Sequence, residues 1–314
     1  MNKTKVLICG ASGFIGRNLF QYFSSRDKYD TYGTYFTNRQ SYPANRFFKA
    51  DLKNKGEALW VTKDMDIVIN AAAMTDGIGA YSGKEDIFKQ NNDLINANVI
   101  EATHVNGVKH CIYLSCTVMY HSSTIPLKEE EFDPIRTHPK YSLLAQMKLF
   151  GEESCRHFAS LGNTKYTVAR HTNIYGPHDK FDLKRGHVLA ATIVKVMQAQ
   201  KNLTVWGSGK ESRDFLYIED LIEFINLAIT HQKNNFDVFN VSYGQSTSIN
   251  ELVEKIIDCS GKKLEVAHDP EKPTIETHMS INSDKANELL GWKAKTKLSE
   301  GLKLTLDWYR NQPR

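Results

Sequence analysis

Short apolar runs alternate with longer segments of helical periodicity over the first 170 residues. The runs end at glycine, asparagine or polar residues, which is typical of buried parallel strands. Strands are predicted over 5–9, 31–36, 66–72, 110–115 and 166–170, and helices over 85–104, over 140–160 and around Leu19, Phe20 and Phe23. This alternation predicts an α/β fold built on a Rossmann-type, doubly wound parallel sheet.

The pattern loosens after residue 170, where a polar, partly basic loop is predicted over 179–187. Helices around 188–200, 219–231, 248–259 and 299–309 and short strands near 203–206 and 236–241 are predicted beyond it. We therefore predict a sheet domain over 1–170, with a later return over about 213–243. The remaining segments, 171–212 and 244–314, are predicted to form a smaller substrate-binding lobe over the carboxyl edge of the sheet.

A glycine-rich segment separates the first predicted strand from the helix after it. Its spacing is G-x-x-G-x-x-G rather than G-x-G-x-x-G. Glycines here allow a tight turn and let the backbone approach a dinucleotide pyrophosphate at the helix N-terminus. A glycine-rich turn without a ligand is the alternative, but the strand–loop–helix context favours a dinucleotide. The predicted contacts are Gly10, Ser12, Gly13, Phe14, Ile15 and Gly16.

The end of the second predicted strand indicates which dinucleotide binds. An acidic residue there would hold the ribose 2′-hydroxyl of NAD, but the sequence is Thr37-Asn38-Arg39. Arg17 comes directly after the last glycine, and guanidinium groups at Arg17 and Arg39 suit the 2′-phosphate of NADP. NADP is therefore the predicted cofactor, with NAD the alternative if both arginines are surface charges. Asp51 and Leu52 resemble the acidic–apolar pair that contacts the adenine end of such cofactors.

Composition narrows the class of partner. The net charge of +4 is mild and no basic block is long, so nucleic acid is not expected as the main partner, whereas an anionic small molecule is. No apolar run reaches about 18 residues and no signal peptide is recognised, so we expect neither a membrane span nor secretion. The five cysteines are scattered without metal-ligand spacing, which predicts free thiols in a reducing cytoplasm and no metal site.

Several further segments, in order along the chain, resemble the extended short-chain dehydrogenase/reductases in their nucleotide-sugar epimerase/dehydratase branch. They are Asn70-Ala71-Ala72-Ala73, Asn92, Arg170 to Pro177, Arg213 to Asp220, Phe239 to Val241, Ser248 to Leu252 and Leu289 to Trp292. The resemblance covers nearly the whole chain. It implies that Ala71 and Ala72 lie under the cofactor and that Asn173 lies at the edge of the substrate site. Arg213 is then a candidate clamp for a nucleotide diphosphate.

One segment narrows the resemblance to GDP-L-fucose synthases. Tyr175 to Phe181, with Gly186, His187 and Val188 soon after, is similar to a run in those enzymes, which epimerise and then reduce a GDP-4-keto-6-deoxyhexose with NADPH. The resemblance implies that His187 is an acid in the epimerisation and that Val188 lies beside it in the substrate site. The alternative is that His187 is a loop histidine in solvent.

The catalytic motif departs from the family pattern. Family chemistry uses a Tyr four residues before a Lys, so that the two share a helix face and the Lys activates the phenol. Here the surroundings of Tyr141 resemble those of the catalytic Tyr, and the run after Lys148 resembles the segment after the catalytic Lys, but seven residues separate them. Their backbones would lie about 10 Å apart instead of about 6 Å in one helix. Leu144 holds the usual Tyr position, and Tyr141 is either a displaced acid or a packing residue.

The hydroxyl partner of that motif is also altered. Cys116 holds the place of the catalytic Ser or Thr, and Thr117 is the candidate substitute. A thiol donates only weak hydrogen bonds, so a sugar carbonyl would be less firmly oriented. Val118 holds the place of the cysteine base of the fucose synthases, which puts full epimerisation in question. The Asp-Glu pair of the 4,6-dehydratases is absent after Cys116, so hexose dehydration is not expected.

These features favour an oxidoreductase of a nucleotide-linked sugar, with a GDP-sugar preferred, as in polysaccharide biosynthesis. The predicted reaction is the NADPH-dependent reduction of a 4-keto sugar, with epimerisation left open. The alternative is a cofactor-binding subunit of the same fold whose catalysis is impaired and whose role is regulatory or scaffolding. The resemblance also implies a homodimer formed by the helices predicted over 85–105 and 140–160.

Overall fold

The computed structural model describes residues 3–38, 43, 45–75, 83, 85–272 and 274–312. Within these residues a seven-stranded parallel sheet has the order β11-β7-β5-β4-β1-β2-β3. The strands are β1 (Thr4–Cys9), β2 (Tyr29–Tyr35), β3 (Phe47–Lys49), β4 (Ile67–Asn70), β5 (His110–Cys116), β7 (Lys165–His171) and β11 (Phe236–Val241). The predicted doubly wound Rossmann-type sheet is confirmed, and the order reverses between β1 and β4, where ligands of such sheets bind.

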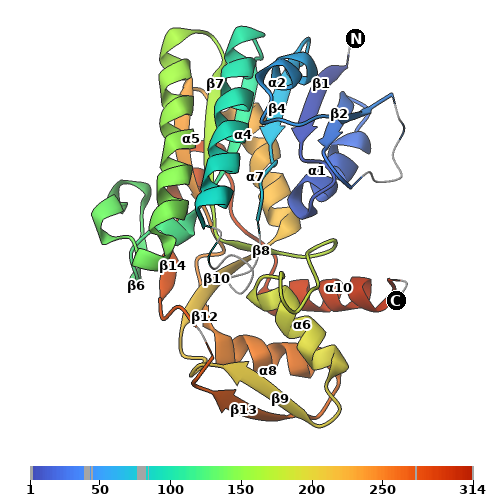
Figure 1. Cartoon of the computed structure of the whole chain (residues 1–314), viewed down its shortest axis with the longest axis vertical. Coiled ribbons are helices and arrows are strands. Elements are labelled where there is room, and N and C mark those ends of the chain that lie inside the picture. Colours follow the sequence, from blue (N-terminus) through green and yellow to red (C-terminus); the bar gives the residue numbers. More distant parts are fainter. Residues whose placement is uncertain are drawn as a thin grey trace.

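Helices cover both faces of this sheet (Figure 1). On one face α1 (Phe14–Ser24) packs against α7 (Ile218–His231). On the other face α2 (Lys55–Thr62), α4 (Glu85–Val105) and α5 (Ser142–Leu161) lie in sequence, and Figure 1 shows α4 and α5 side by side. Strands of a sheet covered in this way are apolar on both faces, which is why they read as continuous hydrophobic runs in the sequence.

A second group of elements lies beyond the carboxyl ends of β5 and β7, below the large sheet in Figure 1. It contains the three-stranded sheet β12-β10-β8, the pair β13-β9, the pair β14-β6 and three more helices. The strands are β6 (Ser123–Leu127), β8 (Asn173–Tyr175), β9 (Asn202–Trp206), β10 (Ser212–Tyr217), β12 (Ser246–Ser248), β13 (Glu265–Asp269) and β14 (Met279–Ile281). The helices are α6 (Val188–Gln198), α8 (Ile249–Ser260) and α10 (Leu298–Arg310), and the shorter α9 (Asp284–Leu290) packs against α7 and β11.

The chain passes between the two groups several times. After β10, which pairs with β8 and β12, it returns to the large sheet through α7 and β11. The division into domains proposed from the sequence remains a prediction. Of the described helices, none is both long and apolar enough to traverse a bilayer.

Local sequence signals define the ends of several helices. The Asn54 side chain accepts hydrogen bonds from the first backbone N–H groups of α2. Ser248 and Glu251 form a reciprocal capping box at the start of α8, and Gly261 ends that helix with φ +75°. These caps satisfy backbone groups that the helix itself leaves unpaired, so the helices begin and end where the capping residues stand.

A buried ion pair joins α5 to the centre of the large sheet. Arg170 donates through Nε and Nη2 to the Glu152 carboxylate, with an Nη2–Oε2 distance of 2.7 Å. The two side chains are only 8% and 3% exposed. Ser115 on β5 donates to Glu152 at 2.5 Å, and Tyr120 accepts from Arg170 at 2.9 Å. Each charge is therefore paired and surrounded by hydrogen bonds, which a buried charge requires.

Replacing Glu152 by Gln is expected to lower the free energy of unfolding by about 3–5 kcal/mol, because Arg170 would keep a buried charge without its counter-ion. The matched control is Glu153→Gln on the same helix. Glu153 pairs with Arg156 at the surface, where its side chain is 63% exposed, and the expected loss there is about 0.5 kcal/mol or less. Urea titration of both variants measures the difference, and equal losses would contradict this role of the ion pair.

Candidate cofactor and catalytic site

The glycine segment forms a tight turn against the end of β4. Gly10 has φ +73°, a backbone conformation that other residues rarely adopt, and a Cβ there would lie 2.7 Å from the Ala72 Cα. A Cβ on Gly16 would lie 2.8 Å from the Gly10 carbonyl carbon. Both positions therefore require glycine, as the predicted turn does.

The turn leads into α1 and leaves the start of this helix open. Gly13 is the N-cap, has no side chain to cap the helix, and donates its own N–H to the Gly10 carbonyl at 3.0 Å. The N–H groups of Phe14, Ile15 and Gly16 have no intrahelical acceptor, as in the first turn of any helix. Three converging N–H groups beside a cradle without Cβ atoms fit the pyrophosphate of a dinucleotide.

Asparagines hold the backbone beneath this turn. Asn92 on α4 exchanges hydrogen bonds with both the N–H and the carbonyl of Met74, at 2.9 and 3.0 Å. Asn70 accepts from the Ala72 N–H at 3.3 Å and donates to Asn96 at 3.2 Å. The segment after β4, which includes Ala71 and Ala72, is thus fixed by side chains under the glycine turn.

The residues predicted to choose between NADP and NAD are only partly described. Arg39 lies outside the described residues. Arg17 Nε is buried without a hydrogen-bond partner among the described groups. Burial, and to a smaller extent the charge of the Arg17 guanidinium, lowers the pKa of His178 to about 4. Asp51 accepts from the Lys53 N–H at 3.1 Å, and Leu52 is buried.

The predicted catalytic side chains converge at the carboxyl end of β5. Lys148 on α5 donates through Nζ to the Leu114 carbonyl at 2.8 Å. Tyr141 is the N-cap of α5 and belongs to the 3₁₀ turn Pro139–Tyr141 that precedes it. Lys148 and Tyr141 each interact electrostatically with Cys116. The wide Tyr–Lys spacing is therefore accommodated by placing Tyr141 before the helix, and both side chains still lie within electrostatic reach of Cys116.

Burial keeps protons on two groups of this cluster. Burial raises the pKa of Tyr141, and the adjacent Arg213 guanidinium acts in the opposite direction by charge and hydrogen bonding. Burial also raises the pKa of the Cys116 thiol, against the charge of Lys148. Burial lowers the pKa of Lys148, while Cys116 and Glu152 act to raise it. At neutral pH the phenol and the thiol are therefore proton donors.

Thr117 is fully buried beside this cluster. Its hydroxyl donates to the His171 carbonyl at 3.4 Å, a long hydrogen bond that ties the end of β5 to the end of β7. The hydroxyl predicted to replace the usual Ser or Thr is therefore in use within the protein.

The residues predicted to contact substrate come from three segments below the sheet. Asn173 on β8 donates to the Asp214 carbonyl at 3.2 Å. Arg213 on β10 donates to the backbone carbonyls of Ser212, Thr277 and Ile275 at 2.6–2.8 Å. His187 is the exposed N-cap of α6, and Val188 is the first residue of that helix. His187 is also close enough to His171 to affect the charge of the His171 ring.

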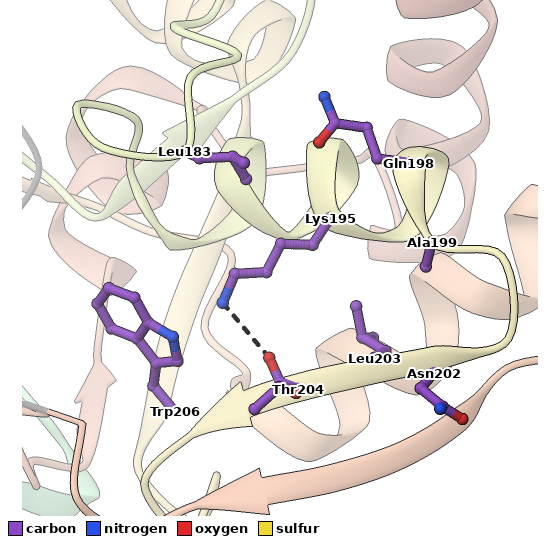
Figure 2. Close-up of a pocket in the computed structure, with 8 residues that line it drawn as sticks. All are labelled: Leu183, Lys195, Gln198, Ala199, Asn202, Leu203, Thr204 and Trp206. Atoms are coloured by element: carbon purple, nitrogen blue, oxygen red, sulfur yellow. Dashed lines mark hydrogen bonds between the residues drawn. The ribbon is translucent and has the colours of Figure 1, made fainter.

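A pocket of about 350 Å³ lies between α6 and β9, as Figure 2 shows. Lys195 extends across it, donates to the Thr204 carbonyl at 3.4 Å and holds its Nζ 4.7 Å from the centre of the Trp206 ring. Burial lowers the pKa of Lys195. Neither Lys195 nor Trp206 belongs to a recognisable sequence motif, because only the proximity of the cation to the aromatic ring in the folded chain marks them.

Comparison with known proteins finds matches along most of the chain. The model of the family described as NAD dependent epimerase/dehydratase matches residues 6–242. GDP-mannose 3,5-epimerase 1 of Oryza sativa is 29% identical over 99% of this chain and 82% of the relative. GDP-L-fucose synthase of Sinorhizobium fredii is 28% identical over 95% of this chain and 93% of the relative.

Among solved structures, the complex of Thermus thermophilus UDP-glucose 4-epimerase with NAD superposes with a TM-score of 0.85. The two chains are 22% identical, and the match covers 98% of this chain and 99% of the other. At that identity the likeness establishes the fold, and it agrees with the sheet order described above.

The close packing of the turn predicts that replacing Gly16 by Ala destabilises the protein more than replacing Gly13 by Ala. Gly16→Ala is expected to lower the free energy of unfolding by about 1–3 kcal/mol, because a methyl group would be forced against the Gly10 backbone. Gly13→Ala serves as the matched control. Its Cβ would lie an ordinary 3.4 Å from the Gly10 oxygen at a φ of −81°, so little change is expected. Urea denaturation of both variants measures the effect, and an unchanged Gly16→Ala would disprove the packing argument.

Proposed function

Because the chain belongs to the NAD dependent epimerase/dehydratase family, as its motifs predicted, we propose that it is an oxidoreductase acting on a nucleotide-linked sugar. The proposed reaction is the NADPH-dependent reduction of a 4-keto sugar carried by GDP, with epimerisation at the neighbouring carbons. The electrostatic proximity of Lys148 and Tyr141 to Cys116, at the sheet edge that also carries the glycine turn, supports it. The names of the relatives, GDP-mannose 3,5-epimerase and GDP-L-fucose synthase, support a GDP-sugar.

The start of α1 supports dinucleotide binding, since its N–H groups are open and the turn before it needs glycine at two positions. Arg17, whose Nε has no partner among the described groups, supports a phosphate contact near this turn. NADP therefore remains the proposed cofactor. When bound, the nicotinamide supplies the hydride for the reduction.

The proposed proton transfer relies on Tyr141. Burial raises its pKa, so the phenol keeps its proton until a negative charge develops on the substrate carbonyl oxygen. The Arg213 guanidinium beside it stabilises the phenolate that remains. Lys148, anchored by the Leu114 carbonyl, puts a second donor beside Cys116. Cys116 itself orients the carbonyl weakly, because a thiol is a poor hydrogen-bond donor.

The α6–β9 pocket is proposed to receive the base of the nucleotide. Trp206 offers an aromatic face, and Lys195 offers a cation that interacts with that face and with a carbonyl oxygen. A planar base with carbonyl groups can replace both contacts by stacking and by accepting a hydrogen bond. Arg213, on the next strand after Trp206, would then lie toward the diphosphate side.

The outer faces of α4 and α5 are proposed to pair two copies of the chain, as the family resemblance implies. Large apolar side chains are exposed along both helices: Ile87, Leu94 and Val105 on α4, and Phe150 and Leu161 on α5. Burying them between copies would remove apolar surface from water.

Wild-type protein mixed with NADPH and GDP-4-keto-6-deoxymannose is expected to consume NADPH, which is monitored by its absorbance. Replacing the substrate by a dTDP-4-keto sugar, or NADPH by NADH, is expected to lower kcat/KM at least about tenfold, the equivalent of one good charged contact. If NADPH binds tightly but is not consumed with any keto sugar, the proposal fails. The seven-residue Tyr–Lys spacing would then favour a non-catalytic regulatory or scaffolding subunit.

Tyr141→Phe is expected to reduce the rate of NADPH consumption by about two orders of magnitude or more, because it removes the proposed proton donor. Tyr22→Phe on α1 is the control, since it makes the same change at a ring whose charged neighbour is Arg26 rather than the catalytic cluster. Steady-state kinetics with saturating substrate measure both. An unchanged rate for Tyr141→Phe would mean that Tyr141 only packs at the start of α5.

A further inference from the structure

His171 lies inside the catalytic cluster although no motif assigned it a role. It is the last residue of β7 and pairs in register with Cys116, the last residue of β5. Lys148 from α5 and His187 from the start of α6 are both close enough to act on the charge of its ring. The side chain is half-buried.

The hydrogen bonding of His171 fixes which nitrogen carries the proton. Nδ1 lies 2.8 Å from the Thr172 carbonyl oxygen, and a carbonyl only accepts, so Nδ1 is the protonated nitrogen. Nε2 then carries a lone pair, and no group in the described part of the chain donates to it. Burial, together with the charges of Lys148 and His187, lowers the pKa of His171 to about 4 against the opposing hydrogen bond to Thr172. The ring is therefore neutral at pH 7.

Four other groups around His171 are donors or are already engaged. Tyr141 and Cys116 hold their protons, and Lys148 donates to a backbone carbonyl. The Glu152 carboxylate accepts from Ser115 and Arg170 one helical turn further along α5. Reduction of a ketone needs a donor, but epimerisation beside a ketone needs an acceptor for a carbon-bound proton. His171 Nε2 is the available acceptor among these groups.

We propose that His171 is a catalytic base that removes the proton from a carbon adjacent to the keto group of the bound sugar. This inference rests on the proposed function. The C–H bond breaks, its electron pair forms a C=C bond, and the carbonyl π pair moves to the oxygen as an enolate. The proton goes to Nε2, and the resulting imidazolium is held by the Nδ1–H hydrogen bond to the Thr172 carbonyl. Return of that proton from Nε2 to the same face restores the sugar. Protonation on the opposite face by water inverts the carbon, and the imidazolium then gives its proton to the hydroxide that remains, with no net oxidation.

Proton removal is measured separately from reduction by hydrogen–deuterium exchange. The protein is incubated in D₂O with GDP-4-keto-6-deoxymannose and no NADPH, and deuterium at C3 and C5 is quantified by mass spectrometry and NMR. His171→Asn keeps a donor for the Thr172 carbonyl but has no basic nitrogen, and His171→Gln is a second variant of similar length. His157→Asn, on the exposed face of α5, is the matched control. NADPH consumption is measured for every variant in a separate assay.

Wild-type protein and His157→Asn are expected to incorporate deuterium. Both His171 variants are expected to lose at least about 100-fold in exchange rate, within the range of a general base, and at least about tenfold more than they lose in NADPH consumption. Equal losses in the two assays, or undiminished exchange in the His171 variants, would overturn the inference and leave the proposed reduction intact. Exchange that requires His171 in a protein that never consumes NADPH would support the base and refute the reduction. Absence of both activities in wild-type protein would refute both.

Discussion

The ion pair between Glu152 and Arg170 is the interaction on which the site depends. It is buried, complete in its hydrogen bonds, and joins α5 to β5 and β7 at one point. Ser115 directly precedes Cys116, Arg170 directly precedes His171, and Glu152 lies one helical turn after Lys148. Ser115, Arg170 and Glu152 therefore each fix the position of a nearby residue in the catalytic cluster. Because separating a buried ion pair costs several kcal/mol, movements of these nearby residues that would break the pair are unfavourable.

A second constraint acts at the cofactor end of the same sheet edge. The glycine turn packs on the end of β4 so tightly that two of its positions have no room for a Cβ. Asn92 and Asn70 hold the backbone on which it rests. Because β1, β4, β5 and β7 are parallel neighbours, their carboxyl ends bring the turn and the catalytic cluster to one edge. This common edge makes hydride and proton transfer in one site geometrically reasonable.

The departure from the usual Tyr-x-x-x-Lys spacing is resolved in the structure by the start of α5. A 3₁₀ turn containing Pro139 places Tyr141 at the N-cap, outside the regular helix, so the helical distance of about 10 Å does not apply. The phenol interacts by charge and hydrogen bonding with Arg213 and lies within electrostatic reach of Cys116.

The sequence by itself determined the α/β fold, the strand and helix pattern of the sheet, the glycine turn and the family, because each depends on short-range signals such as apolar runs, helix caps and ordered motifs. It also singled out Tyr141, Lys148 and Cys116, but could not say whether Tyr141 was displaced or merely packed. The tertiary structure decided that Lys148 and Tyr141 both lie within electrostatic reach of Cys116, that Arg213 lies beside the phenol, that Lys195 lies over Trp206 and that Nδ1 of His171 donates to the Thr172 carbonyl. Most of these contacts join residues far apart in the chain, and burial and hydrogen-bond partners that exist only after folding set their protonation.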